Sequence, residues 1–417
     1  MKKIILSLMT LVSLTASAQF GGFGGRGQGN PWVDSEAAVS EDFKPALSNQ
    51  DSKQYPMVNS ARQVRAQISA PNATKVGLDI AGKIYTMTKD ENGVWTGTSA
   101  PQDPGFHYYQ LNVDGASVPD PGSLYYYGAS RWGSGIEVPS EDQDFWQVKN
   151  VPQGSMGEVY YYSSYTEKMR RCFVYLPNEY FTNPTKKFPV LYLQHGMGEN
   201  EYSWPYQGHV ASILDNLIAA KKAVPFIVVM DNGLNANKPL PAGEMPQGLQ
   251  GGQRPQGGQR PQGGQRPQGG FGGFGGFGGG FADGFKNVLF NDIMPMIEKN
   301  YRVIADPAHR AYAGLSMGGM QAREVTLANP GKFAYVGSFS SGAWSVDQVK
   351  NSEGFAKNTK LLFMSGGGKE NMGCVEAAKN IKEQLGMNAV GYESPGTAHE
   401  FHTWRRSLYE FAQLLFK

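Results

Sequence analysis

The hydrophobic pattern of the chain divides it into two regions. In the first, short segments alternate apolar and polar residues, at 64–68, 75–80, 94–98 and 105–115. Turn pairs such as Asn92-Gly93 and Asp114-Gly115 separate these segments. Alternation interrupted by turn residues is typical of half-buried β-strands. Several short strands at this spacing predict an all-β sandwich over residues 45–148.

In the second region, residues 149–417, continuous apolar runs replace the alternation. Such runs lie at 189–193, 223–230 and 360–364, and they are typical of parallel strands covered on both faces. Helices are predicted to end at residue 221, to span 290–298 and to close the chain at 406–416, where Leu408, Phe411, Leu414 and Leu415 recur with helical period. Strands that alternate with helices predict an α/β fold, with a mostly parallel sheet and helices on both faces.

Residues 1–18 have the pattern of a secretory signal peptide. Lys2 and Lys3 supply the positive start, residues 4–14 supply the apolar run, and Ala16-Ser17-Ala18 is a small-residue cleavage site. The apolar run is too short to span a bilayer, and we expect no membrane span elsewhere. We therefore expect a secreted or periplasmic protein whose mature chain begins near Gln19. An uncleaved anchor is the alternative.

Two further tracts have low complexity. Residues 19–44 begin with a run rich in Gly and Phe and predict a flexible leader. Residues 245–281 contain three tandem Gln-Arg-Pro-Gln-Gly-Gly units followed by Phe-Gly-Gly repeats. Such a composition buries too little apolar surface to offset its ordering entropy, so we expect a disordered insertion within the α/β region. It is either a tolerated surface insertion or a segment whose Arg and Phe side chains contact an aromatic or polymeric ligand.

Charge and cysteine usage exclude several classes of partner. The formal net charge is only +2, which argues against a nucleic-acid partner. We expect Cys172 and Cys374 to be free and buried, although export would permit a disulfide between them. Neither cysteine has metal-ligand spacing, and the Gly-rich tract lacks the Lys and Ser/Thr of a phosphate-binding loop. We therefore expect neither a metal nor a cofactor.

The stretch from Gly314 to Gly318 carries the strongest chemical signal. It reads G-x-S-x-G, the nucleophile elbow of the α/β hydrolases, with Ser316 at its centre. Residues 310–313 before it read as a strand and residues 319–325 after it as a helix, which is the context that an elbow requires. The sequence therefore predicts an α/β-hydrolase domain with Ser316 as nucleophile. A tight Gly-rich turn with a passive serine is the alternative.

A serine nucleophile needs a base, and in this fold the acid and then the histidine follow it along the chain. His399 and His402 are the histidines after Ser316, and we favour His399 because it follows a Gly-containing loop. The acid should lie at the end of the preceding strand, where Glu370 is the first carboxylate. Glu376 is the alternative acid, although it should lie inside a helix.

The oxyanion of such a reaction needs two backbone N–H donors. Met317, directly after the nucleophile, is expected to supply one. The loop after residues 189–193 should supply the other, and we favour Met197. His195 in the same loop is expected to be structural rather than a base.

These motifs together resemble the esterase D group. The resemblance rests on Gln194-His195-Gly196-Met197-Gly198, on Asp231-Asn232-Gly233, on the elbow, and on His399-Glu400-Phe401 with Trp404-Arg405. More narrowly, the chain is similar to family-one carbohydrate esterases, which include feruloyl and acetylxylan esterases. The resemblance implies a triad of Ser316, His399 and Glu370, with Glu where many relatives carry Asp. Residues 105–115 and Asp120-Pro121-Gly122 resemble the early-set immunoglobulin-like modules that precede the catalytic domain of glycogen-branching enzymes, which implies an immunoglobulin-like sandwich for the β-region.

The resemblance implies an exported serine esterase that removes feruloyl or acetyl groups from a plant cell-wall polysaccharide such as xylan. Its partner would be an esterified polysaccharide or oligosaccharide, and its oligomeric state stays open. Trp204, Tyr206 and Trp344 are candidates to line the acyl slot. A siderophore or other small-ester esterase is one alternative. A non-catalytic glycan-binding protein is another, in which aromatic residues of the β-region such as Trp95, Tyr125 and Trp132 would stack on sugars.

Overall fold

The structure is a computed structural model that describes residues 29–35, 37–234, 236–239 and 280–417. The predicted signal peptide lies outside the described residues. So does the predicted insertion, apart from residues 280 and 281, which begin helix α3 and therefore do not belong to a disordered tract. Among the described residues, no helix is both long and apolar enough to cross a membrane. Cys172 and Cys374 are both buried, and each carries a free thiol.

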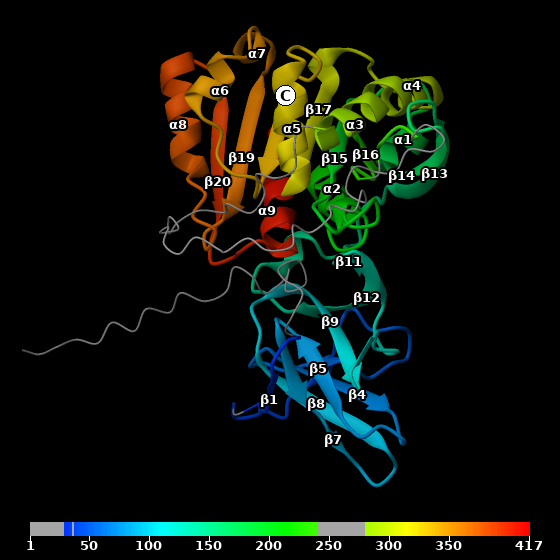
Figure 1. The fold of residues 1–417 in the computed structure, drawn as a ribbon. Coiled ribbons are helices and arrows are strands. Elements are labelled where there is room, and N and C mark those ends of the chain that lie inside the picture. The colour runs from blue at the N-terminus through cyan, green and yellow to red at the C-terminus, as the bar shows by residue number, and fades with distance from the viewer. Residues whose placement is uncertain (1–28, 36, 235, 240–279) are drawn as a thin grey trace, which may run out of the picture.

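Strands β1 to β12 form a β-sandwich, which we call the β-module (Figure 1). One sheet has the order β1-β6-β5-β9-β12-β11 with β10 beside β9, and the other has the order β2-β3-β4-β8-β7. Fully buried residues such as Val64, Leu78 and Leu111 fill the space between the sheets. The strands are β1 (Trp32–Val33), β2 (Lys44–Pro45), β3 (Met57–Val58), β4 (Gln63–Ser69), β5 (Val76–Ile80), β6 (Lys83–Thr86), β7 (Thr88–Lys89), β8 (Val94–Pro101), β9 (Gly105–Val113), β10 (Ala116–Val118), β11 (Tyr125–Gly128) and β12 (Arg131–Val138).

The β-module begins earlier in the chain than its alternating pattern indicates. Trp32 pairs with Ile84 of β6, and the ammonium of Lys75 lies 3.8 Å from the centre of the Trp32 ring. The prediction of a flexible leader up to residue 44 is therefore wrong for this part of it. A two-residue strand is too short for a periodic pattern, so only its pairing reveals it.

The α/β region is built on one sheet in the order β13-β14-β16-β15-β17-β18-β19-β20. The pairs β13–β14 and β14–β16 are antiparallel, and the other neighbours are parallel. Because the strands from β16 to β20 run in one direction, their carboxyl ends meet at the same edge, where ligands bind in such sheets. The strands are β13 (Ser155–Ser163), β14 (Lys168–Leu176), β15 (Val190–Gln194), β16 (Ile227–Asp231), β17 (Arg310–Leu315), β18 (Tyr335–Phe339), β19 (Leu361–Gly367) and β20 (Ala389–Ser394).

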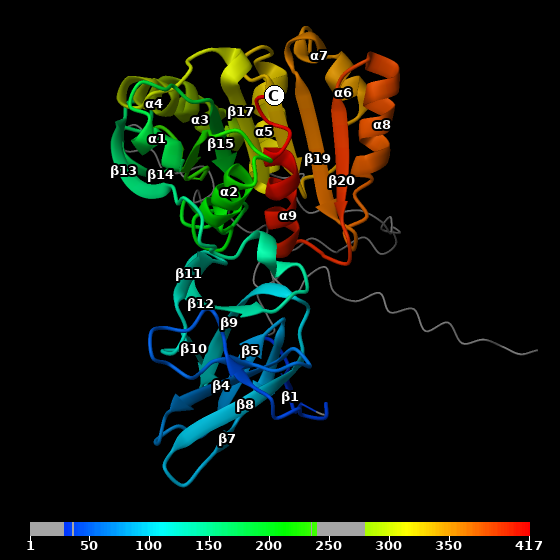
Figure 2. The same ribbon diagram turned by 180° about the vertical axis from the view of Figure 1, so that it is seen from behind.

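Helices cover both faces of this sheet (Figure 1, Figure 2). Alternate residues of a strand enter different cores: Tyr312 packs with the core of α3 to α8, and Ala311 and Ala313 pack with the core of α2 and α9. The helices are α1 (Asn178–Thr182), α2 (Val210–Ala219), α3 (Gly280–Val288), a π-helical turn η2 (Leu289–Ile293), α4 (Met294–Asn300), α5 (Met317–Ala328), α6 (Val346–Lys350), α7 (Phe355–Asn358), α8 (Cys374–Leu385) and α9 (Phe401–Ala412), with 3₁₀ turns η1 (Gln143–Phe145) and η3 (Pro307–His309).

The β-module packs closely against the α/β region, below α9 in Figure 2. The ring of Phe106 from β9 lies 5.9 Å from that of Phe401 and belongs to the core of α2 and α9. The fully buried Arg405 of α9 donates from Nη1 to Glu137 Oε2 of β12 at 3.1 Å. Its Nε donates to the Gln207 carbonyl at 2.7 Å. The contact between the two regions therefore contains both an apolar core and a buried ion pair.

Replacing Arg405 by Met should destabilise the protein by about 3–5 kcal/mol, because the buried Glu137 carboxylate would lose its ion pair and keep only its contact with His209. Burial raises the pKa of Glu137, but the charge of Arg405 and the hydrogen bonds from His209 and Arg405 outweigh it and lower the pKa from 4.5 to about 2. A lowered carboxyl pKa contributes stability that is present above the ordinary pKa and is lost as pH falls toward about 2. Urea unfolding at pH 7 and pH 3 measures both effects. Lys149→Met, which removes the exposed pair with Asp144, is the control, and an equal loss in both variants would contradict the prediction.

Candidate active site

Ser316 lies between β17 and α5 on a sharply bent backbone. Its φ is 50° and its ψ is −115°, a strained conformation that is typical of a nucleophile elbow. Its N–H donates to the Phe339 carbonyl at 2.7 Å, which fixes the turn to β18. A Cβ atom at Gly314 would fall on the backbone of Gly318, so the two flanking positions approach too closely for any other residue.

His399 lies in the loop between β20 and α9 and connects the other two predicted residues of the triad. Its Nε2 lies 2.9 Å from Ser316 Oγ, and its Nδ1 lies 2.7 Å from Glu370 Oε1. An ionised carboxylate only accepts hydrogen bonds, so Nδ1 carries the hydrogen and Nε2 is left to accept the serine proton. The structure thus brings Ser316, His399 and Glu370 together in the order that base catalysis requires.

Glu370 follows β19, and its side chain is only 1% exposed. Its Oε2 accepts from Ser340 Oγ at 2.6 Å and from the Gly367 N–H at 2.7 Å. Burial raises the pKa of Glu370, but the hydrogen bond and charge of His399, together with these two donors, lower it below its ordinary value. The sequence does not predict the contact of Ser340 with Glu370, because a lone serine after a strand belongs to no motif.

The two alternative residues lie elsewhere. His402 is buried on α9 with its Nε2 3.2 Å from Asp142 Oδ1, and burial lowers its pKa to about 4. Glu376 is exposed within α8. His399 contacts both Ser316 and Glu370, so the geometry favours His399 and Glu370 over these two residues as the reacting pair.

The second predicted oxyanion donor lies beside the elbow. A Cβ atom at Gly196 would lie 3.4 Å from Ser316 Cβ, which places the loop of residues 195–199, here called the oxyanion loop, against the nucleophile. The N–H groups of Met197 and Met317 donate to no acceptor that the described residues supply. That these two groups serve as the oxyanion donors stays a prediction.

His195 has a structural place in this loop. Its Nε2 accepts from the Gly233 N–H at 3.0 Å, so Nδ1 carries the ring hydrogen and donates to the Gly196 carbonyl at 2.7 Å. Burial lowers the pKa of His195 to about 4, which keeps the ring neutral at neutral pH. Because the Gly196 carbonyl and the Met197 N–H share one planar peptide unit, His195 also fixes the direction of the Met197 N–H.

The residues proposed to line the acyl slot divide into two kinds. Trp204 and Trp344 are each only 1% exposed, and their Nε1 atoms donate to the Gln194 carbonyl at 2.8 Å and to Ser338 Oγ at 3.2 Å. They are core residues, so the prediction that they line a slot is wrong for these two. Tyr206 is 49% exposed and stays a candidate.

The aromatic candidates of the β-module also separate by burial. Trp95 is 7% exposed and belongs to the core of the sandwich. Tyr125 and Trp132 are 45% and 47% exposed. The Trp132 ring lies 4.9 Å from that of Tyr202, which follows the oxyanion loop, so an exposed ring of the β-module borders the active-site region.

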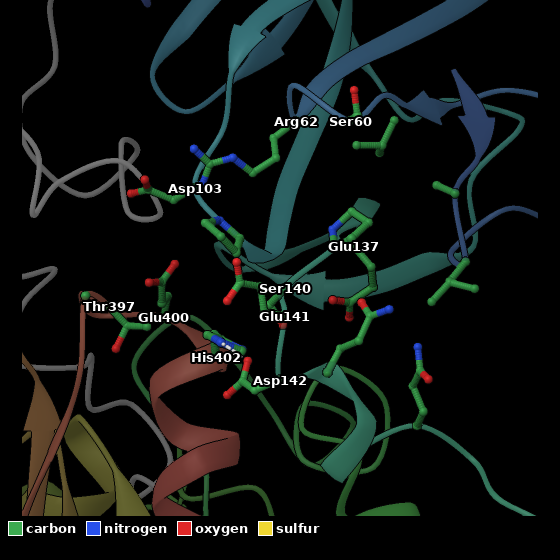
Figure 3. A pocket seen from close by; sticks show the side chains of 18 of the residues that line it. Ser60, Arg62, Asp103, Glu137, Ser140, Glu141, Asp142, Thr397, Glu400 and His402 are labelled. Carbon is green, nitrogen blue, oxygen red and sulfur yellow. Dashed lines mark ion pairs between the residues drawn. The ribbon is translucent and has the colours of Figure 1, made fainter. Parts of the chain in front are cut away.

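A cavity of about 1080 Å³ lies between the β-module and the α/β region (Figure 3). Arg62 and Asp103 face it from the β-module, while Thr397, Glu400 and His402 face it from the loop and helix that follow β20. Ser316 and His399 are not among its lining residues. Two of its cations are paired, Lys369 with Asp103 at 2.9 Å and Arg406 with Asp142 at 2.7 Å. The cavity therefore borders the loop that carries His399 but not the nucleophile itself.

Within the described ranges, no group of three or more His, Cys, Asp or Glu side chains is placed to hold a metal ion. A strained serine at a strand-to-helix turn, on a mostly parallel sheet, is typical of the α/β hydrolases.

Sequence similarity to known proteins identifies the family to which the chain belongs. The Esterase family model matches residues 163–259 and 253–414, so the chain belongs to the Esterase family and its class is that of the carboxylic-ester hydrolases. The chain is 41% identical over 385 residues to a protein of Xylanibacter ruminicola named endo-1,4-beta-xylanase/feruloyl esterase. The match covers 90% of this chain but 48% of the relative, so the chain spans about half the length of that protein.

Solved structures share the fold. The enterobactin esterase of Shigella flexneri aligns with a TM-score of 0.55 at 15% identity, over 85% of this chain and 93% of the other. That likeness takes in the β-module as well as the α/β region, and it confirms an α/β hydrolase preceded by a β-domain. A ferulic acid esterase of Anaeromyces mucronatus aligns with a TM-score of 0.48 at 20% identity, over 66% of this chain and 95% of the other.

Proposed function

We propose that this chain is a serine esterase that releases hydroxycinnamate, such as ferulate, from esterified plant cell-wall polysaccharide. The observation that carries the proposal is the hydrogen-bonded series of Ser316, His399 and Glu370 at the elbow. The 41% identity to a protein named xylanase/feruloyl esterase supports the acyl group and the polysaccharide. The pattern of residues 1–18 supports export of the protein to the substrate.

The arrangement of the site supports a two-step reaction. Ser316 Oγ attacks the ester carbonyl carbon while His399 Nε2 takes its proton, and Glu370 stabilises the imidazolium that forms. The Met197 and Met317 N–H groups donate hydrogen bonds to the carbonyl oxygen and stabilise the negative charge that develops on it. His399 then gives its proton to the departing sugar oxygen, which leaves ferulate bound to Ser316. A water molecule, deprotonated by His399, releases the ferulate and restores the serine.

A panel of esters tests this proposal and separates it from the alternatives. We expect hydrolysis of methyl ferulate and of feruloylated arabinoxylan, with kcat/KM on methyl ferulate at least about tenfold above that on acetylated xylan, since a pocket that fits an aromatic acid gains binding energy from it. Released acids are measured by chromatography. A preference for acetylated xylan or for a catecholate siderophore ester would contradict the proposed acyl group. Binding to xylan without hydrolysis of any ester would contradict the enzyme itself.

A further inference from the structure

The oxyanion loop is held from both sides, and one side is the β-module. Within the α/β region, the Glu199 N–H donates to the Gly196 carbonyl at 3.3 Å, and the Gly196 N–H donates to Glu199 Oε2 at 3.1 Å. From the β-module, the Ser130 N–H donates to the Gly198 carbonyl at 2.8 Å. Ser130 lies at the turn of the hairpin β11–β12. This hairpin therefore contacts the loop at Gly198, two residues after Gly196, which lies beside Ser316.

The side chain of Glu199 extends this contact to a second strand of the β-module. Glu199 is only 2% exposed and its carboxyl group lies near the Tyr108 hydroxyl of β9, but Glu199 Oε1 has no hydrogen-bond partner among the described residues. That hydroxyl in turn accepts from Gln207 Nε2 at 2.7 Å, and the same Nε2 donates to the Tyr127 carbonyl at 2.8 Å. The carboxyl group is therefore held through Oε2, which accepts from the Gly196 N–H at 3.1 Å. Burial raises the pKa of Glu199 to about 8, against the opposing effect of the Gly196 and Tyr108 contacts, so the group is mostly neutral at pH 7.

We propose that the β-module holds the oxyanion loop in its working position through the Ser130 N–H and the Tyr108–Gln207 contact, with Glu199 as the positioning residue that fixes Gly196. This inference rests on the proposed function, since it concerns the loop whose Met197 N–H would stabilise the transition state. The hairpin β11–β12 and strand β9 of the β-module then position a loop of the active site, so the module is more than a spacer. Glu199 fixes the peptide unit before Gly196, His195 fixes the one after it, and Ser130 fixes the loop at Gly198.

The test measures kcat and KM separately, with p-nitrophenyl acetate as substrate because it reports on the machinery whatever the natural acyl group. Glu199→Ala should lower kcat by about 10- to 100-fold, because small misplacements in an active site cost this much, while KM changes little. Glu199→Gln, which is neutral and keeps a hydrogen-bond acceptor for Gly196, should retain most of the activity. Affinity for a boronic acid, which forms a tetrahedral adduct on a reactive serine, should fall in parallel with kcat.

Neighbouring tyrosines provide the matched control for the β-module. Tyr108→Phe removes the hydroxyl that accepts from Gln207 Nε2, and should lower kcat by about threefold to tenfold, because it loosens the contact of β9 with the α/β region beside the oxyanion loop. Tyr109→Phe removes the next hydroxyl on β9, which donates to Asp120 inside the β-module at 2.7 Å, and should leave kcat unchanged. Equal effects of the two variants, or unchanged kcat in Glu199→Ala, would overturn the inference. A folded wild-type protein without turnover would instead contradict the proposed function.

Discussion

Ser316→Ala should abolish the esterase activity, with kcat lower by about 10⁴- to 10⁶-fold. Ser316 Oγ lies 2.9 Å from His399 Nε2 and is the atom that would form the acyl-enzyme, so its removal leaves only the oxyanion donors and the binding energy of the site. The measurement is kcat on p-nitrophenyl acetate and methyl ferulate. Mass spectrometry should show a transient acyl adduct in the wild type that is missing from the variant.

The control is Ser345→Ala, which removes the hydroxyl that accepts from the Gln348 N–H at the start of α6. It should lose a helix cap, worth about 1 kcal/mol, and keep its kcat. Thermal unfolding shows that both variants are folded. A folded Ser316→Ala protein that keeps a tenth or more of the wild-type kcat would mean that another group is the nucleophile.

Much of the fold follows from local patterns in the sequence. Alternating residues predict β4, β5, β8 and β9 within a few positions, and continuous apolar runs predict β15, β16 and β19. The closing helix was misplaced: α9 spans Phe401–Ala412, whereas the apolar period begins only near Arg406. Its first turn is buried but contains His402 and Arg405, whose partners Asp142 and Glu137 come from distant parts of the chain. Buried polar residues interrupt the apolar period of a helix, so periodicity alone misses the start of the helix.

The active site likewise contains residues that the sequence predicts and residues that it does not. Ser316, Glu370 and His399 follow the ends of β17, β19 and β20, and a parallel sheet brings such ends together, so motif and chain order are enough to predict their meeting. Ser340 acts through a tertiary contact with Glu370, for which a single sequence carries no local signal. Glu199 contacts Gly196 within the same turn, but its burial depends on tertiary packing that a single sequence does not show. Trp204 and Trp344 show the same limit, because an aromatic residue in a loop fits a core as well as a ligand slot.

His399 and His402 should differ sharply when each is replaced. His399→Ala should lower kcat by about 10⁴- to 10⁶-fold, since the variant has no group to take the Ser316 proton. His402→Gln should keep kcat within about tenfold, because His402 contacts Asp142 rather than the nucleophile and its loss acts mainly on stability. Glu370→Gln should lie near His399→Ala, at about 10⁴-fold below the wild type, because a carboxamide cannot stabilise the imidazolium.

Added imidazole distinguishes a missing base from a damaged fold. The space left by His399→Ala lies between Ser316 Oγ and the Glu370 carboxylate, which are the two groups that would hold and orient a free imidazole. We therefore expect imidazole to restore part of the activity of His399→Ala, in a dose-dependent way, and to have no effect on Ser316→Ala. Rate measurements at several imidazole concentrations, with thermal unfolding as a check on folding, decide between the two histidines. An inactive, folded His402→Gln protein beside an active His399→Ala protein would show that the base is His402.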